Sequence, residues 1–152
     1  MKNTAEEDLK YMKAALDQAC MAAERDEVPI GAVVVSGGEI IARGYNMTET
    51  LSDPTAHAEM QVITSAAARL GGKYLDKCTL YVTVEPCPMC ASALYWAHLE
   101  RLVYGSADPK RGYTTVVGEL LHPKTEVVKG IMEYECGEIV SDFFSRIRKK
   151  AL

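Results

Sequence analysis

Four residues of types that bind metals and move protons lie in two short segments of the sequence. His57 and Glu59 stand two positions apart, and Cys87 and Cys90 stand three apart. Each pair lies at an expected helix start, where unpaired N–H groups and the positive end of the helix dipole favour thiolate over thiol. Zinc binds imidazole and thiolate tetrahedrally. The spacing therefore predicts one Zn2+ per subunit, bound by His57, Cys87 and Cys90.

Three protein ligands leave the fourth position of a tetrahedral zinc site to water, which distinguishes a catalytic site from a structural one. A carboxylate beside that position can accept a proton from the water and deliver it to a ring nitrogen and a departing amino group. The expected reaction replaces an amine by a carbonyl with loss of ammonia. We therefore predict a zinc-dependent hydrolytic deaminase in which Glu59 is the catalytic acid and base.

Three other functions are compatible with a pair of cysteines. A structural zinc site needs a fourth ligand, and the spacing nominates none of the candidates, which are Cys78, His98, His122 and Cys136. A redox cysteine pair has no use for Glu59. A non-catalytic binding module stabilised by zinc would keep the ligands without turnover, and it stays open as an alternative.

Length and composition indicate a soluble globular protein with one domain. The chain has 152 residues, and no apolar run approaches the roughly 20 residues that a membrane-spanning helix needs. Residues 1–17 hold three successive acids and no apolar block before a cleavage site, which argues against a secretory signal. Five cysteines cannot all pair, which suits a reducing compartment. We expect a cytoplasmic protein that does not bind membranes.

The charge is unevenly distributed along the chain, whose formal net charge is −4. Residues 1–100 carry 8 basic and 14 acidic side chains, whereas residues 101–152 carry 9 and 7. The overall acidity argues against a general nucleic-acid binder, and the basic last third leaves room for a local one. Four cations, Arg146, Arg148, Lys149 and Lys150, suit phosphates and equally suit the C-terminal dipole of a helix.

Helices at the expected places would position the four residues. Thr4 and Glu7 form a capping box for a first helix. Its expected inner face is Leu9, Met12, Leu16, Ala19, Cys20 and Ala23. Further helices are expected over 57–70, over 88–99 and from residue 133, the last with an inner face of Ile139, Phe143, Phe144 and Ile147.

Strands are expected between these helices. Residues 30–36 and 39–45 form a hairpin around Gly37-Gly38, and further strands cover 78–84, 101–105 and 126–131. Strands separated by helices imply parallel pairs, and the initial hairpin makes the sheet mixed. The predicted fold is α/β, a three-layer α/β/α sandwich with a mixed five-stranded sheet.

The segments His57-Ala58-Glu59 and Pro86-Cys87-Pro88-Met89-Cys90 together resemble the signature of the cytidine deaminase-like zinc deaminases. The likeness is greatest to the bacterial tRNA-specific adenosine deaminases, and residues 27–35, 45–46, 53–59, 80–87 and 141–144 carry it. It implies one zinc-binding domain of the cytidine/deoxycytidylate deaminase type over residues 1–152. It also implies that the substrate is the wobble adenosine of a tRNA anticodon arm, converted to inosine.

The resemblance implies roles for further residues. Asn46 and the backbone of Ala58 would hold the flipped base, Val28 and Pro29 would form pocket wall, and Asp108, Lys110 and Arg111 would contact flanking nucleotides. The same residues have simpler readings, since Asn46 could be a turn residue that ends a strand and residues 108–111 could be a solvated loop.

The sequence departs from the tRNA deaminase pattern at Pro88 and at residues 92–98. Tyr95-Trp96-Ala97 is more similar to bacterial guanine deaminases of the same superfamily, so deamination of guanine, or of another free base or nucleoside, is the alternative function. Tyr95 and Trp96 could instead be core or subunit-contact residues. Apolar residues on more than one face of this helix predict a homodimer, which the resemblance also implies.

Overall fold

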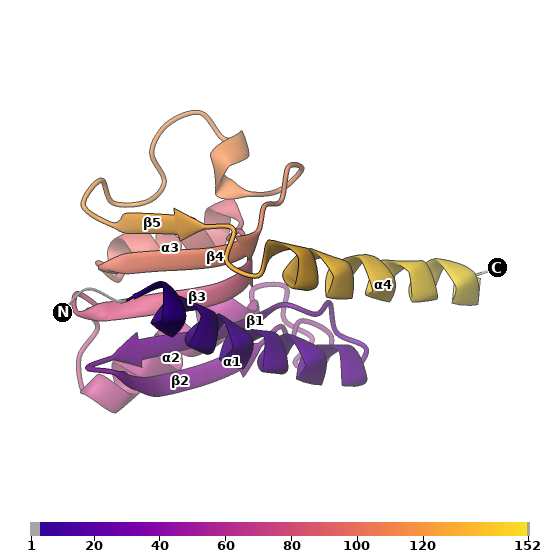
Figure 1. Cartoon of the computed structure of the whole chain (residues 1–152), viewed down its shortest axis with the longest axis horizontal. Coiled ribbons are helices and arrows are strands. Elements are labelled where there is room, and N and C mark those ends of the chain that lie inside the picture. The colour runs from indigo at the N-terminus through magenta and orange to yellow at the C-terminus, as the bar shows by residue number, and fades with distance from the viewer. Residues whose placement is uncertain (1–3, 152) are drawn as a thin grey trace.

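The computed structural model describes residues 4–151, and its helices and strands alternate along the chain (Figure 1). The helices are α1 (Ala5–Glu24), α2 (Ala58–Leu70), α3 (Pro88–Trp96) and α4 (Glu133–Ala151). The strands are β1 (Gly31–Ser36), β2 (Glu39–Tyr45), β3 (Cys78–Val84), β4 (Arg101–Ser106) and β5 (Glu126–Lys129). A short 3-10 helix, Tyr113–Thr115, lies in the long loop between β4 and β5.

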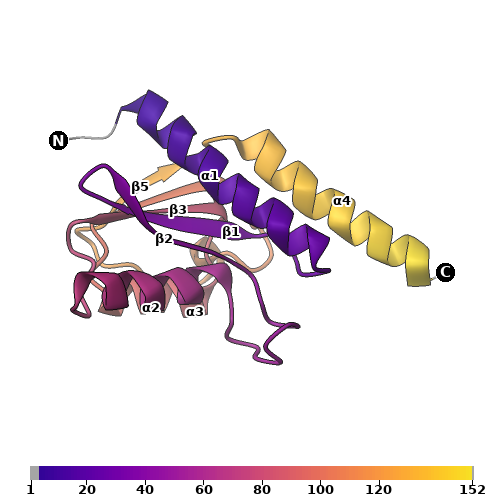
Figure 2. The ribbon, with the colours of Figure 1, turned by 90° about the horizontal axis from the view of Figure 1, so that it is seen from below.

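The five strands form one mixed sheet in the order β2-β1-β3-β4-β5. β1 runs antiparallel to both of its neighbours, and β3, β4 and β5 are parallel. Helices α1 and α4 cover one face and α2 and α3 cover the other (Figure 2). The predicted three-layer fold with a mixed five-stranded sheet is confirmed.

Alternate residues of the central strands supply two separate cores. Leu80 and Val82 pack with Val62 and Leu94 on the side of α2 and α3. Residues Met12, Val33, Tyr81, Val103 and Cys136 form the core on the side of α1 and α4. Among the helices of residues 4–151, none combines the length and the apolar character needed to cross a membrane.

The predicted signals for turns and helix ends act where the sequence places them. Gly37 and Gly38 have φ of 57° and 77°, the left-handed conformation that a two-residue hairpin turn requires. Thr4 accepts a hydrogen bond from the backbone N–H of Glu7 at 3.2 Å and caps α1. Helix α2 ends at Gly71, which is also left-handed.

The prediction for the inner face of α1 is partly wrong. Met12 and Ala19 are buried as expected, whereas Leu9 is 45% exposed and Cys20 is also exposed. The buried face consists of Asp8, Tyr11, Met12, Ala15, Ala19 and Ala22. The apolar members of this face, from Tyr11 to Ala22, do lie at helical spacing, and the predicted face differs because it began at Leu9 and not at Asp8.

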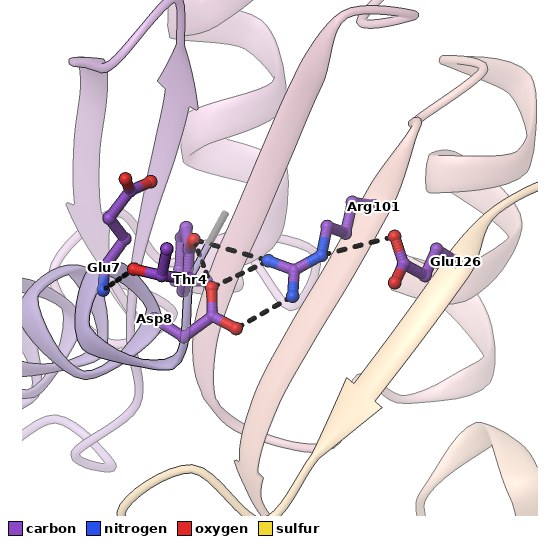
Figure 3. A network of polar contacts seen from close by, with 6 residues as sticks. Thr4, Glu7, Asp8, Arg101 and Glu126 are labelled. Atoms are coloured by element: carbon purple, nitrogen blue, oxygen red, sulfur yellow. Dashed lines mark hydrogen bonds and ion pairs between the residues drawn. The ribbon is translucent and has the colours of Figure 1, made fainter. Parts of the chain in front are cut away.

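Asp8 is buried because it pairs with Arg101 of β4 (Figure 3). Two guanidinium nitrogens of Arg101 donate to its two carboxylate oxygens at 2.7 and 2.8 Å, and the Tyr81 hydroxyl donates at 2.7 Å. Burial by itself raises the pKa of Asp8, but the hydrogen bonds from Arg101 and Tyr81 lower it below its usual value. Arg101 also contacts Glu126 at 3.4 Å, so one guanidinium joins α1, β4 and β5.

Two helix predictions need correction. Helix α3 ends at Trp96 and not near residue 99, because His98 takes a φ of 56° that no α-helix continues through. On α4, Phe144 and Ile147 are 41% and 45% exposed, although both were expected on the inner face. The last turns of α4 extend past the sheet and have no layer to pack against (Figure 1).

Gly31 at the start of β1 lies at a close approach of α1 to the sheet. A Cβ atom there would overlap the carbonyl oxygen of Ala15 and the amide nitrogen of Ala19, which are backbone atoms and cannot rotate away. We expect Gly31→Ala to lower the free energy of unfolding by about 1–3 kcal/mol in urea titrations. Gly72→Ala is the matched control, since a Cβ at Gly72 meets open space. Equal stability of the two variants would contradict this packing.

Candidate active site

Two helix starts on the same face of the sheet bring the four chemically competent residues together. His57 is the residue immediately before α2, and Glu59 lies in the first turn of that helix. Cys87 stands immediately before α3, which begins with Pro88, and Cys90 lies in its first turn. The proline fits because the first residue of a helix needs no N–H partner.

His57, Cys87 and Cys90 point their ligand atoms at a common centre. The Nδ1 atom of His57 lies 3.6 Å from Sγ of Cys87 and 3.5 Å from Sγ of Cys90, and all three atoms lie within 4.8 Å of one another. A tetrahedral zinc ion with ordinary bond lengths holds nitrogen and sulfur about 3.6 Å apart. Within residues 4–151 the group contains these three ligands and no fourth. The donor set therefore fits a metal with one open position.

The orientation of the His57 ring also fits a metal ligand. The hydrogen bond with Cys87 and, to a smaller extent, the backbone of Pro54 raise the pKa of His57. Metal-binding histidines usually have a backbone or carboxylate partner for the second ring nitrogen, because such a partner fixes the tautomer and the ring plane. The segment before α2 thus supplies both the ligand and its support.

Hydrogen bonds among the two thiols and the imidazole shift the pKa values of all three groups. Cys90 donates a hydrogen bond to Cys87, which lowers the pKa of Cys87 to about 4. The same bond, together with burial, raises the pKa of Cys90. The hydrogen bond with Cys87 likewise raises the pKa of His57. A bound divalent cation would deprotonate both sulfurs, because coordination favours thiolate far more strongly than a hydrogen bond does.

Glu59 is a buried carboxyl group beside this centre, with 4% of its surface exposed. Burial raises its pKa to about 7. It also hydrogen-bonds to Cys90, so it lies next to the ligand group without belonging to it. A carboxyl group with a pKa near neutrality can both accept and donate protons at neutral pH, which is the property required of a general acid and base.

A pocket of about 630 Å³ opens over the ligand group. Its lining includes His57, Glu59 and Cys87, together with the residues predicted from the resemblance except Pro29, namely Val28, Asn46, Ala58, Asp108, Lys110 and Arg111. Pro29 is buried and does not line it. The N–H of Ile30 donates to the carbonyl of Val28 at 2.8 Å, and this tight turn brings residues 28 and 30 to the pocket and leaves residue 29 out.

Asn46 immediately follows β2 and is 6% exposed. Its backbone N–H donates to the carbonyl of Ile30 at 3.0 Å, so it also ends the strand as the simpler reading proposed. The two readings are compatible, because the backbone holds the turn while the residue lines the pocket.

Sequence reasoning missed several residues of the pocket. Val140 and Phe144 of α4 form part of its wall, and Phe144 was instead expected in the core. Two buried glutamates, Glu27 and Glu85, hold neighbouring loops. The position of Glu85, two residues before Cys87, was the one available signal.

Tyr95 and Trp96 lie outside the pocket lining. They belong to an aromatic surface cluster with Tyr74, His98 and His122, whose ring centroids lie 4.3–6.2 Å apart from neighbour to neighbour. Trp96 is 75% exposed, Tyr74 44% and Tyr95 37%. Neither aromatic of α3 shapes the space where a substrate base would bind.

Comparisons with known proteins agree with this fold and site. The family model described as MafB19-like deaminase matches residues 6–148. A solved structure from studies of A-to-I editing by tRNA:A34 deaminases at the wobble position superposes with a TM-score of 0.81 and 46% identity, covering 86% of this chain and 98% of that one. The fold and the His/Cys/Cys group beside a buried carboxyl define a cytidine deaminase-like deaminase.

A tRNA-specific adenosine deaminase and a guanine deaminase differ in how much of this chain they match. The tRNA-specific adenosine deaminase of Bacillus subtilis is 48% identical over 95% of this chain and 92% of its own. A guanine deaminase structure from Bacillus subtilis is 43% identical with a TM-score of 0.62, but it covers 64% of this chain and 63% of that one. The chain belongs to the MafB19-like deaminases, in the family of the bacterial tRNA-specific adenosine deaminases.

Proposed function

We propose that this protein converts the wobble adenosine of a tRNA anticodon to inosine by hydrolytic deamination. The observation that carries the proposal is the convergence of His57, Cys87 and Cys90 beside buried Glu59, at the floor of a pocket of about 630 Å³. The 48% identity to a tRNA-specific adenosine deaminase along nearly the whole chain supports the choice of substrate. In the net reaction, adenosine and water give inosine and ammonia.

We propose that His57, Cys87 and Cys90 hold one Zn2+ per subunit. When bound there, zinc acts as a Lewis acid and makes water a nucleophile near neutral pH. Glu59 takes a proton from the attacking water and passes it to the ring nitrogen next to the reacting carbon. It then takes the second proton of the attacking water and delivers it to the amino group, which leaves as ammonia. The raised pKa of Glu59, about 7, suits a group that must gain and lose a proton in every cycle.

Pocket residues of this chain would hold the base once it leaves the stack. Asn46 can read the base edge with its amide, the backbone of Ala58 can hydrogen-bond to it, and Val28 supplies apolar wall. Pro29 would support this wall from its buried position. Asp108 lies at the rim with Lys110 and Arg111, where nucleotides flanking the base would pass.

The charged end of α4 would bind the RNA backbone. Arg146, Arg148, Lys149 and Lys150 are all exposed on its last turns. The same helix lines the pocket through Phe144, so phosphates bound at its end would lie along the way to the pocket. Cations at this place suit an anticodon arm better than a free base, which carries no phosphate.

We further propose that two copies of the chain associate through the aromatic cluster around Trp96. Exposed aromatic residues are enriched at interfaces between proteins, and a self-complementary patch would give a symmetric dimer.

Within the dimer each subunit would act as one domain over residues 1–152, since α1 and α4, from opposite ends of the chain, pack against one another. A cytoplasmic location follows from the proposed tRNA substrate.

Incubation with a tRNA whose anticodon begins with A tests the function. We expect stoichiometric inosine at that position on sequencing and no ammonia release from guanine. Inosine-free tRNA with release of ammonia from guanine would replace the proposal by the free-base alternative. Inactivity of the zinc-loaded protein on every amino-base would indicate a binding module instead.

A further inference from the structure

Glu85 is a buried carboxylate that the proposed chemistry does not use. It lies between the end of β3 and Cys87, and only 5% of its surface is exposed. One oxygen, Oε1, accepts the backbone N–H of Asp108 at 3.1 Å. The other, Oε2, accepts the N–H and the hydroxyl of Thr114 at 3.0 and 2.8 Å. All its partners lie in the loop that follows β4.

The loop has few other attachments to the body of the protein. The N–H of Tyr113 donates to the carbonyl of Pro86 at 2.9 Å, and the remaining hydrogen bonds at Asp108 are internal, to the N–H groups of Lys110, Arg111 and Gly112. Residues 109–111 are exposed. The loop is therefore attached to the protein by hydrogen bonds to residues 85 and 86 and by Tyr113, which packs against the core on the side of α2 and α3.

Gly112 shows how closely the loop fits this carboxylate. A Cβ atom at Gly112 would overlap Oε2 of Glu85 and crowd the carbonyl of Asp108. The carboxylate cannot turn aside, because three hydrogen bonds fix it. Only glycine therefore permits the observed approach.

A similar device holds the loop that follows β2, which reaches the pocket at Asn46 and Thr48. Glu27 is fully buried, and its carboxylate accepts the N–H of Glu49 at 3.1 Å and both the N–H and the hydroxyl of Thr50 at 2.6 Å. Each of these two loops is thus held by one buried glutamate that accepts two backbone N–H groups and one threonine hydroxyl. Two loops that reach the pocket are therefore fixed by the same kind of contact.

We propose that Glu85 is a positioning residue that sets the specificity of the proposed reaction for RNA. It holds the loop so that Asp108, Lys110 and Arg111 stay at the pocket rim in a fixed position relative to Cys87. Cys87 lies two residues after Glu85 in the sequence. The inference rests on the proposed function, because it assigns the loop to nucleotides that flank the reacting adenosine. Glu85 also lines the pocket, and we assign its effect to the loop because the hydrogen bonds of its carboxylate all go to Asp108 and Thr114.

The test compares Glu85→Gln with the wild type on an anticodon stem-loop that carries adenosine at the wobble position. An amide cannot accept every bond that the carboxylate accepts, so an N–H group of the loop loses its partner. We expect KM to rise about tenfold, with kcat changed by less than about threefold. Hydrogen exchange of residues 106–115 should accelerate about tenfold, while zinc content stays at one per subunit.

Thr114→Val should give a smaller change in the same direction, because it removes one of the three donors. Thr125→Val is the matched control, since its hydroxyl also bonds a backbone group, the carbonyl of Leu99, but outside the pocket. Unchanged loop exchange in Glu85→Gln would overturn the proposal, and so would a loss of kcat at constant KM. A wild type inactive on RNA would refute the proposed function alone, because the exchange comparison still decides whether Glu85 holds the loop.

Discussion

Replacing Glu59 by Gln is expected to lower kcat for tRNA deamination by about 10³-fold or more, because the side chain keeps its shape and loses its ability to carry a proton. The variant should still bind one zinc ion per subunit, since Glu59 is not part of the ligand group. Its thermal stability should equal or exceed that of the wild type, because a neutral amide is easier to bury than a carboxylate. Single-turnover kinetics, metal analysis and thermal unfolding measure the three quantities.

Glu39→Gln is the control for this experiment. Glu39 is exposed at the start of β2, outside the pocket lining, so the same change of charge should leave all three quantities unaffected. A Glu59→Gln variant that keeps wild-type kcat would show that another group moves the proton. Loss of zinc from the variant would instead place Glu59 among the ligands.

Replacing Cys90 by Ser is expected to remove the metal and all measurable activity. Cys90 is fully buried, and the hydroxyl offered in place of the thiolate is a poor zinc ligand. Zinc content should fall from one per subunit to near zero. The free energy of unfolding should fall by about 4 kcal/mol, the value for a metal present at a thousand times its dissociation constant. Metal analysis and urea unfolding measure both.

Wild-type protein treated with a chelator should lose activity and stability by the same amounts and recover both when zinc is added. Cys20→Ser, at an exposed cysteine, should behave as the wild type throughout. Full zinc binding by the Cys90→Ser variant would contradict the ligand assignment. If zinc restores the chelated wild type and other divalent metals do not, the experiment also establishes which metal the group accepts.

The order of helices and strands could be predicted because local signals determine it. Gly37-Gly38 requires a hairpin turn, Gly71 ends α2, and Pro88 begins α3. The ligand group could be found for a related reason, since the residues stand in pairs at short spacing, and the start of a helix sets where each pair points. Each pair depends on neighbours in the sequence, whereas the approach of His57 to the two cysteines, 30 and 33 residues later, depends on the fold.

The remaining features depend on contacts between distant residues. Asp8 is buried on α1 because it pairs with Arg101, 93 residues later, which no pattern within the helix reveals. Phe144 lines the pocket and does not pack in the core, because this part of α4 is not covered by the sheet. Glu85 holds a loop that lies more than 20 residues further on. Pro29 was misplaced because the tight turn at residues 28–30 left no pattern in the sequence.

Glu59 and the ligand group lie at the starts of two helices packed against the sheet, whereas the pocket rim comes from connecting loops and the middle of α4. Selection can therefore alter the rim, at positions such as Asn46, Asp108 or Phe144, without disturbing the chemistry beneath it. A lineage with this architecture could acquire a new amino-base as substrate through a few changes around the pocket. Proteins that share the fold at low identity would then differ mainly in which nucleobase they admit.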